Sequence, residues 1–362
     1  MITVGVVVNP VAGMGGRVGL HGTDGPALAT AVERGATPVA PHRARRALDR
    51  LHALAPDLRI VTVEGPMGTD HLSGSGWRVD VLPGRQAPTT AADTRAAVEA
   101  MAGVGLVLFV GGDGTARDVA DVVGTGVPVL GVPSGVKMHS GVFATGPEVA
   151  GATAARFAAD PARVGTVDAE VVDLDGSSPR LFGLARVPHI RDALQGAKSA
   201  GSGGGDLVGL GREVAAETPP GTLLLLGPGT TVAHVSAALG VPASPLGVDA
   251  VLDGVLLAED ADESTLLTLL ARHPRARLVL GVVGGQGFLL GRGNQQISAD
   301  VLAAVGPDHL EILAAPGKVA ALDPPVLRVD LGDERATTPV TGYHRVRTGR
   351  GRSTVLRVVA QL

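Results

Sequence analysis

The stretch Gly105–Asp118 constrains the fold most, because it joins an apolar run to a cluster of glycines. A short apolar run that ends at glycine predicts a strand buried on both faces, here Val104–Val110. The chain then turns around one carboxylate, Asp113, before an amphipathic helix predicted over Thr115–Val123. This order predicts an anion site, and Asp113 within it indicates a proton to accept or a cation to hold. The glycines of the turn are Gly111, Gly112 and Gly114.

Strands and helices alternate along the first part of the chain. This order predicts an open, mostly parallel, Rossmann-like sheet, in which ligands lie beyond the carboxyl ends of the strands. The second helix carries four arginines that are predicted on a solvated face. They are Arg43, Arg45, Arg46 and Arg50. The other predicted strands are Ile2–Val8, Leu58–Val63, Arg78–Leu82 and Val127–Val132, and the other helices are Pro26–Arg34, His42–Leu54 and Ala91–Met101.

Glycine-containing loops follow four of these strands and are predicted at one edge of the sheet. The first carries Gly13, Gly15 and Gly16, and the cluster Gly22-Thr23-Asp24-Gly25 comes soon after it. Such clusters suggest a dinucleotide or phosphate loop, with a plain turn as the alternative. In the last loop, Lys137 could neutralise phosphate and His139 or Ser140 could contact a substrate; the alternative is a helix start capped by Ser134. The four loops are Asn9–Gly16, Glu64–Gly68, Gly111–Thr115 and Pro133–Ser140.

A second, strand-rich mixed α/β domain is predicted after residue 148. We place the first domain at 1–148, the second at 149–340, and C-terminal strands that could return to the first domain at 341–362. A further ligand-facing loop, Gly227–Thr231, is predicted between a strand and a helix, and Lys198–Gly205 is predicted to be a mobile loop. The predicted elements are strands at Val164–Val172, Arg180–Val187, Thr222–Leu226, Val248–Ala258, Arg277–Val283, Val326–Leu331 and Val355–Val359, and helices at Val232–Leu239 and Ser264–His273.

The segment Gly284–Gln296 combines five glycines with several amide and guanidinium side chains. Such groups suit a phosphate or the edge of a base, and a plain turn does not need so many polar side chains. The segment therefore favours a ligand site over a decorative turn. Its polar residues are Gln286, Arg292, Asn294, Gln295 and Gln296.

The amino-acid composition excludes several classes of partner and of chemistry. The 362 residues carry 31 Lys and Arg against 35 Asp and Glu, a net charge of −4, which argues against nucleic acid as a partner. The absence of cysteine excludes disulfides, thiol nucleophiles and thiolate metal sites. No signal peptide or membrane span is apparent in the sequence, so we expect a cytoplasmic protein without a membrane partner.

The motifs together resemble the ATP-NAD kinase family over nearly the whole chain. The resemblance is to the branch of predicted ATP- or polyphosphate-dependent NAD kinases that includes the acetoin-catabolism protein X. Gly-Gly-Asp-Gly-Thr alone is shared with other kinase families, whereas the Asn9–Gly16 start and Gly291–Gln296 point to this branch. The remaining motifs are Gly22–Gly25, Asp93-Thr94, Gly111–Asp118, Gly135–Ser140, Pro228–Thr231 and the rest of Gly284–Gln296.

The resemblance implies a two-domain fold and phosphoryl transfer from ATP, with Mg²⁺, to the 2′-hydroxyl of the adenosine ribose of NAD. Asp113 is then the catalytic residue beside the acceptor hydroxyl, with Lys137 or Arg292 supplying positive charge, and no metal ligand is assigned. A homodimer or homotetramer is expected. The nucleotide-binding residues predicted are Asn9, Gly13, Gly15, Gly16, Asp24, Gly111, Gly112, Gly114, Thr115, Lys137, His139, Ser140, Gly229, Thr230, Thr231, Gln286, Arg292, Asn294 and Gln295.

Two departures from the family pattern leave the acceptor open. The region where the family usually carries an Asn-Glu pair reads Ala169-Glu170-Val171-Val172-Asp173-Leu174-Asp175, without asparagine, and no tyrosine follows Thr230-Thr231. The alternatives are a kinase for another small hydroxyl compound and a catalytically silent protein that binds NAD or another nucleotide. Fold alone does not decide among them.

Overall fold

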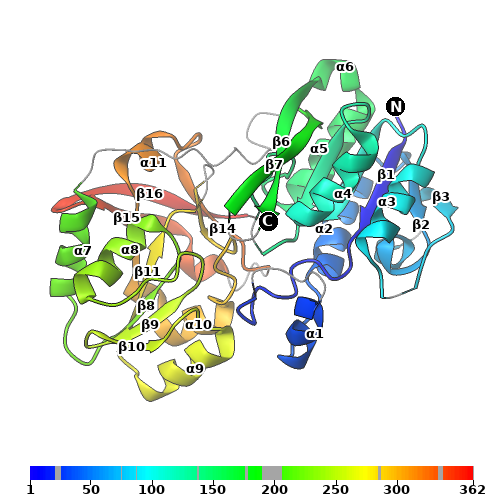
Figure 1. Cartoon of the computed structure of the whole chain (residues 1–362). Helices are drawn as coiled ribbons and strands as arrows, with labels where there is room; N and C mark the ends of the chain where they lie inside the picture. The colour runs from blue at the N-terminus through cyan, green and yellow to red at the C-terminus, as the bar shows by residue number, and fades with distance from the viewer. Residues whose placement is uncertain are drawn as a thin grey trace.

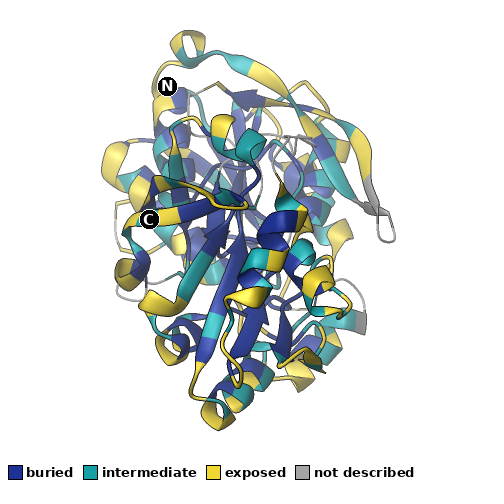
Figure 2. Cartoon of the chain, turned by 90° about the vertical axis from the view of Figure 1, so that its left-hand side faces the viewer, coloured by how far each residue is buried: buried dark blue, intermediate teal, exposed yellow. Residues whose placement is uncertain are grey.

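The computed structural model describes residues 1–20, 26–74, 76–86, 88–136, 138–175, 178–189, 206–283, 287–332 and 337–361. The chain forms two units side by side, each built around its own sheet (Figure 1). The strands are largely buried, whereas exposed residues gather on the outer turns of helices and on loops (Figure 2). No helix among these residues is long and apolar enough to cross a membrane.

The first unit contains a parallel sheet of five strands in the order β3-β2-β1-β4-β5. This confirms the predicted open parallel sheet. The order reverses between β1 and β4, and such a switch point is where open α/β sheets bind ligands. The strands are β1 (Val4–Val8), β2 (Arg59–Val63), β3 (Arg78–Leu82), β4 (Leu106–Gly111) and β5 (Val129–Pro133).

Helices cover both faces of this sheet, which explains why its central strands are apolar throughout. On one face α2 and α5 pack together over Val6 and Leu108, and on the other α3 and α4 pack over Val107 and Phe109. Thr90 and Asp93 form a capping box that starts α3. The helices are α1 (Pro26–Glu33), α2 (Ala40–Leu54), α3 (Ala91–Ala100), α4 (Asp113–Val123), α5 (Pro147–Ala159) and α6 (Pro161–Val164), with short 3₁₀ helices at Gly65–Met67 and Thr69–His71.

A separate antiparallel hairpin follows α6 and packs on the first unit. Its strands are β6 (Thr166–Asp175) and β7 (Ser178–Pro188). Val171, Ala185 and Val187 join the same apolar core as Val119 of α4. The hairpin therefore lies against the helix that follows the glycine turn, as Figure 1 shows.

The second unit contains a mixed sheet of nine strands in the order β10-β9-β8-β11-β13-β15-β16-β14-β12. With the first sheet, it confirms the predicted two-domain α/β class. Helices α7 and α8 cover one face, and α9 and α10 pack together with the core of the other. The strands are β8 (Leu223–Leu226), β9 (Asp249–Leu252), β10 (Val255–Ala258), β11 (Ala276–Gly281), β12 (Phe288–Leu290), β13 (Leu310–Leu313), β14 (Val326–Val329), β15 (Gly342–Gly349) and β16 (Arg352–Ala360). The helices are α7 (Leu207–Ala216), α8 (Thr230–Leu239), α9 (Glu263–Arg272), α10 (Ala299–Val305) and α11 (Pro316–Ala320), with 3₁₀ helices at Pro307–His309 and Thr338–Val340.

Several local predictions need correction. Val248–Ala258 is a hairpin, β9 and β10, because the chain turns at Asp253-Gly254, both with positive φ. Helix α4 begins at Asp113 rather than at Thr115. Arg43 does not lie on a solvated face: it is 8% exposed and ion-paired. The C-terminal strands β15 and β16 pair within the larger sheet, and Gln361, just after β16, donates to Thr145 Oγ1 of the first unit at 3.3 Å, so the domain bounds stay a prediction. The predicted mobile loop Lys198–Gly205 lies outside the described residues.

Candidate functional site

Three of the predicted glycine loops meet at the switch point between β1 and β4. Asn9, just after β1, donates its side-chain amide to Thr115 Oγ1 at 3.0 Å. The backbone N–H of Asn9 donates to Val110 O at 2.9 Å, and that of Ser134, just after β5, donates to Gly111 O at 2.9 Å. The sheet thus brings the ends of β1, β4 and β5 into one cluster, in which Asn9 and Thr115 lie 106 positions apart in the sequence.

Close approach between these loops explains two of the glycines. Gly13 has a φ of +80°, and a Cβ there would lie 2.0 Å from Ser134 O. A Cβ on Gly112 would lie 3.0 Å from Gly135 Cα. Gly13 therefore has no room for a side chain, and a side chain at Gly112 would require the neighbouring backbone to shift by a few tenths of an ångström. Both glycines thus allow the loops to approach closely. Gly16 faces the second unit instead, because its Cβ would lie 3.0 Å from Gln295 Cβ; Gly15 accepts the N–H of Leu20 through its carbonyl.

Asp113 is enclosed at the start of α4 and is 5% exposed. Its Oδ2 accepts the backbone N–H of His139 at 2.6 Å, and its Oδ1 accepts that of Ser140 at 3.0 Å. Burial raises the pKa of Asp113 to about 6, an increase that these hydrogen bonds oppose and the nearby charge of Asp173 supports. A carboxyl with such a pKa exchanges protons near neutral pH, which is what a general base requires.

The loop over Asp113 is fastened to the hairpin. Ser140 Oγ donates to Val172 O at 2.8 Å and accepts the Val172 N–H at 3.0 Å, and Gly141 N–H donates to Glu170 O at 2.9 Å. Beside it, Arg117 on α4 forms an ion pair with Asp173 at 2.9 Å. The predicted residues His139 and Ser140 therefore contact Asp113 through their backbone amides.

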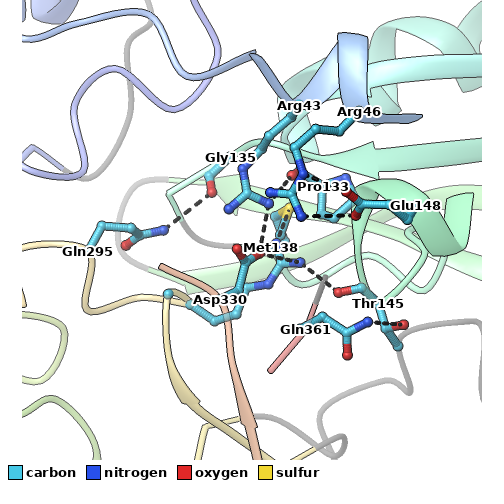
Figure 3. A network of polar contacts seen from close by, with 12 residues as sticks. Arg43, Arg46, Pro133, Gly135, Met138, Thr145, Glu148, Gln295, Asp330 and Gln361 are labelled. Atoms are coloured by element: carbon cyan, nitrogen blue, oxygen red, sulfur yellow. Dashed lines mark hydrogen bonds and ion pairs between the residues drawn. The ribbon is translucent and has the colours of Figure 1, made fainter. Parts of the chain in front are cut away.

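The segment after β12 lies against the same loop from the second unit. Gln295 Nε2 donates to Val136 O at 2.8 Å and also to Gly135 O at 3.4 Å, the contact drawn in Figure 3. Arg292 Nη2 donates to Thr145 O at 3.1 Å. Asn294 instead uses both ends of its amide within its own turn, on Gly291 N–H and Leu289 O. These polar groups therefore have protein partners, and their predicted contact with a nucleotide stays a prediction.

Gly229, Thr230 and Thr231 lie elsewhere, at the start of α8 in the second unit (Figure 1). Gly229 has a φ of +110°, which turns the chain into the helix. Among the described residues, no hydrogen bond or ion pair joins these three to the loops around Asp113. Asp24, Lys137 and Gln286, also predicted to bind nucleotide, lie outside the described residues.

A buried ion cluster that was not predicted joins the two units. Asp330, just after β14, lies 2.8 Å from Arg43 Nη1 of α2 and 3.9 Å from Arg292 Nη2 (Figure 3 labels Arg43 and Asp330). Burial favours the neutral acid, but Arg43 and Arg292 outweigh it and hold the pKa of Asp330 below its ordinary value. The helical spacing of the sequence could have indicated that Arg43 is buried, because Arg43 lies on the same face of α2 as the buried residues Ala40, Ala44 and Ala47.

Family models match both units of this fold. Residues 4–162 match the ATP-NAD kinase N-terminal domain, and residues 221–358 match the ATP-NAD kinase C-terminal domain. The chain belongs to the ATP-NAD kinase family. No curated protein and no solved structure gives a significant match. Membership implies a phosphotransferase of the kinase class, in a family that uses ATP and a divalent metal.

The described residues around Asp113 do not include a cluster of side chains that could hold a metal ion by themselves. Among the residues that the structure describes, no three His, Asp or Glu side chains gather where they could hold an ion. Both oxygens of Asp113 accept backbone amides, and Asp173 is paired with Arg117. Mg²⁺ usually binds one or two carboxylates together with substrate phosphates, so the metal of this family would enter with its nucleotide.

The departures from the family pattern have structural counterparts. Val232, where a tyrosine usually follows the threonines, is 1% exposed and belongs to the apolar core beneath α8. Glu170, beside the missing asparagine, is an exposed residue of β6 whose carbonyl accepts the Gly141 N–H. Val232 therefore offers no polar side chain to an acceptor, whereas Glu170 still presents a carboxylate.

Proposed function

We propose that the protein transfers a phosphoryl group from ATP or polyphosphate to the 2′-hydroxyl of the adenosine ribose of NAD, giving NADP. The observation that carries this proposal is Asp113, a buried carboxylate with a raised pKa at the switch point of the sheet. Membership of the ATP-NAD kinase family supports the reaction class and both substrates.

In the proposed reaction, the hydroxyl oxygen attacks the terminal phosphorus of the donor. The new O–P bond forms as the bond to the leaving phosphate breaks, and the hydroxyl proton passes to the carboxylate of Asp113. The hydroxyl takes the place of one of the amides that Asp113 now accepts, from His139 or Ser140. Binding of the acceptor is therefore coupled to a shift of residues 138–140. The backbone N–H groups at the start of α4 stabilise the phosphate charge.

Incubation of the purified protein with NAD and Mg²⁺, and with either ATP or polyphosphate, tests the proposal. We expect NADP to form with at least one donor, measured with an NADP-specific dehydrogenase. Absence of NADP with every donor, from protein that is folded by circular dichroism, would overturn the NAD assignment.

A second candidate is a kinase of the same fold for another small hydroxyl compound. The apolar Val232 and the Ala169 that replaces asparagine favour it, because both remove polar groups from the acceptor side. ATP turnover that depends on a different acceptor and on Asp113 would support it. Tight NAD binding by calorimetry without any turnover would instead indicate a silent nucleotide-binding protein. Cytoplasmic location and a homodimer or homotetramer stay predictions.

The pH dependence of the reaction follows from Asp113. We expect kcat/KM to rise with pH through about 6, because a base must be ionised to accept the proton. The free energy of unfolding should change in the opposite direction. Because the pKa of Asp113 is higher in the folded protein than its ordinary value of 3.8, the contribution of Asp113 to stability falls as the pH rises from about 4 to about 6. His42→Gln is the control, since burial and Arg46 lower the pKa of His42 from 6.5. If the rise of kcat/KM near pH 6 disappears in His42→Gln, that rise belongs to His42 and not to Asp113.

A further inference from the structure

A cluster of charged side chains lies beside Asp113, where the β6–β7 hairpin packs on the start of α4 (Figure 1). Arg117 of α4 forms an ion pair with Asp173 of β6 at 2.9 Å. A Cβ on Gly114, the residue after Asp113, would lie 3.8 Å from Asp173 Oδ2. The carboxylate of Asp173 therefore lies against the first turn of the helix that carries Asp113.

The side chains around Asp173 hold its ion pair in place. The guanidinium carbon of Arg117 lies 5.2 Å from the ring centroid of Phe182 on β7, which is a cation–π contact. Arg180, the residue opposite Asp173 in the β6–β7 ladder, lies over the same ring at 5.4 Å. Arg117 is thus fixed between a carboxylate on one strand of the hairpin and an aromatic ring on the other.

The same strand also contacts the loop that covers Asp113. The backbone of Val172, the residue before Asp173, accepts from Ser140 Oγ at 2.8 Å and donates to it at 3.0 Å. The N–H of Ser140 in turn donates to Asp113 Oδ1 at 3.0 Å. A single residue of the loop therefore links Asp113 to the strand that carries Asp173, which keeps the two carboxylates close together.

Two like charges are therefore held in a place where water screens them poorly. Asp113 is 5% exposed, and the side chain of Asp173 is 19% exposed. Charges interact more strongly in such surroundings than they do in bulk water. Burial raises the pKa of Asp113 to about 6, and the charge of Asp173 adds to that increase. The charge of Arg117 has the opposite sign, so it acts on Asp113 in the opposite direction.

Other titratable or charged residues lie on the elements packed around Asp113. They are His139 in the loop, Glu170 and Arg180 on the hairpin, and Asp118 on α4, which is ion-paired with Arg95. Lys137, in the same loop, lies outside the described residues. Substitutions in the Arg117–Asp173 pair leave all of these in place, so the effect of the pair on Asp113 can be measured separately.

We propose that Asp173 is a positioning residue for the proton transfer, because its negative charge makes Asp113 hold a proton more tightly and Arg117 limits this effect. The role rests on the proposed function, in which Asp113 accepts the proton of the acceptor hydroxyl. A base that holds its proton more tightly takes it up more readily, but fewer molecules carry the ionised base at low pH. The Arg117–Asp173 pair thus sets the pH range in which the reaction proceeds.

Titration of Asp113 by NMR of isotope-labelled aspartate carboxyl groups tests this role without any substrate. The signal of Asp113 in the full chain is identified by its absence in Asp113→Asn. Asp173→Asn should move the titration midpoint of Asp113 to lower pH, because it removes a like charge. Arg117→Gln should move the midpoint to higher pH, because it removes an opposite charge. Each shift should be about 0.5 pH unit or more.

Two further measurements provide controls. The double variant Arg117→Gln/Asp173→Asn removes both charges, so its midpoint should lie between those of the two single variants. Arg59→Gln and Asp80→Asn break an exposed ion pair between β2 and β3, and both should leave the midpoint of Asp113 unchanged.

The opposite signs of the two shifts separate an effect of charge from an effect of structure. If the pair only fastened the hairpin to α4, both single variants would break the same contact and would move the midpoint in the same direction. Shifts of equal sign, or a midpoint that either variant leaves unchanged, overturn the proposal. The rise of kcat/KM with pH should move with the NMR midpoint in each variant. NMR midpoints that shift as expected, in a protein that makes no NADP or whose kcat/KM profile does not follow them, contradict the proposed function and not the control of Asp113 by the pair.

Discussion

Asp113→Asn is expected to lower kcat by about 10²–10⁴, the usual contribution of a general base. The asparagine side chain keeps the size of the aspartate but cannot take up a proton from the acceptor hydroxyl. Its effect should fall mainly on kcat, because a general base takes up the proton of the acceptor hydroxyl only as the reaction proceeds. Initial rates with saturating NAD and donor measure the change.

Stability should change little in the same variant, because two effects of similar size oppose each other. A pKa raised from 3.8 to about 6 means that the ionised carboxylate costs about 3 kcal/mol at neutral pH, which the neutral amide removes. Against this, an asparagine has one acceptor oxygen for the N–H groups of His139 and Ser140, and the loss of one such hydrogen bond costs about 1.5–3 kcal/mol. Chemical denaturation should therefore give nearly the original free energy of unfolding.

Asp118→Asn is the matched control on the same helix. Asp118 is also 5% exposed, but it is ion-paired with Arg95 rather than with the loop over Asp113. We expect it to destabilise the protein while leaving kcat within about threefold of the original, far less than loss of a general base. Equal losses of kcat in both variants would show that Asp113 acts through the fold rather than as a base.

The first sheet and the position of Asp113 were predictable because both depend on short stretches of sequence. The central strands β1, β4 and β5 are apolar runs that end at a glycine or proline loop, and parallel strands place those loops at one edge. The contact between Asn9 and Thr115 follows directly from that rule. Helix α4 starts two residues before its predicted position, because a glycine at the second position of the helix lowers the helical preference of its first turn.

The contacts between the units were not predictable in the same way. Gln295 reaches Val136, and Arg43 reaches Asp330, across stretches of chain that show no shared local pattern. The polar segment Gly291–Gln296 was interpreted by its composition, which does not distinguish a side chain that binds a ligand from one that binds another part of the chain. Asn294 illustrates this, because both ends of its amide are used within its own turn.

Asp330→Asn is expected to lower the free energy of unfolding by about 3–5 kcal/mol, because it leaves two buried guanidiniums without their counter-ion. The side chain of Asp330 is 0% exposed, and those of Arg43 and Arg292 are 9% and 8% exposed. Water therefore cannot replace the lost charge without opening the contact between the units. Denaturation in guanidinium chloride measures the loss, followed by probes in each unit so that separate transitions are detected.

Asp80→Asn provides the matched control, because it removes a carboxylate from an exposed pair with Arg59 and should cost less than about 1 kcal/mol. Adding Arg43→Met to Asp330→Asn should restore part of the stability, since one of the two unpaired charges is then gone. The free energy that Arg43→Met costs is measured alone and again in the Asp330→Asn background. Equal costs in the two backgrounds would contradict coupling between the two residues.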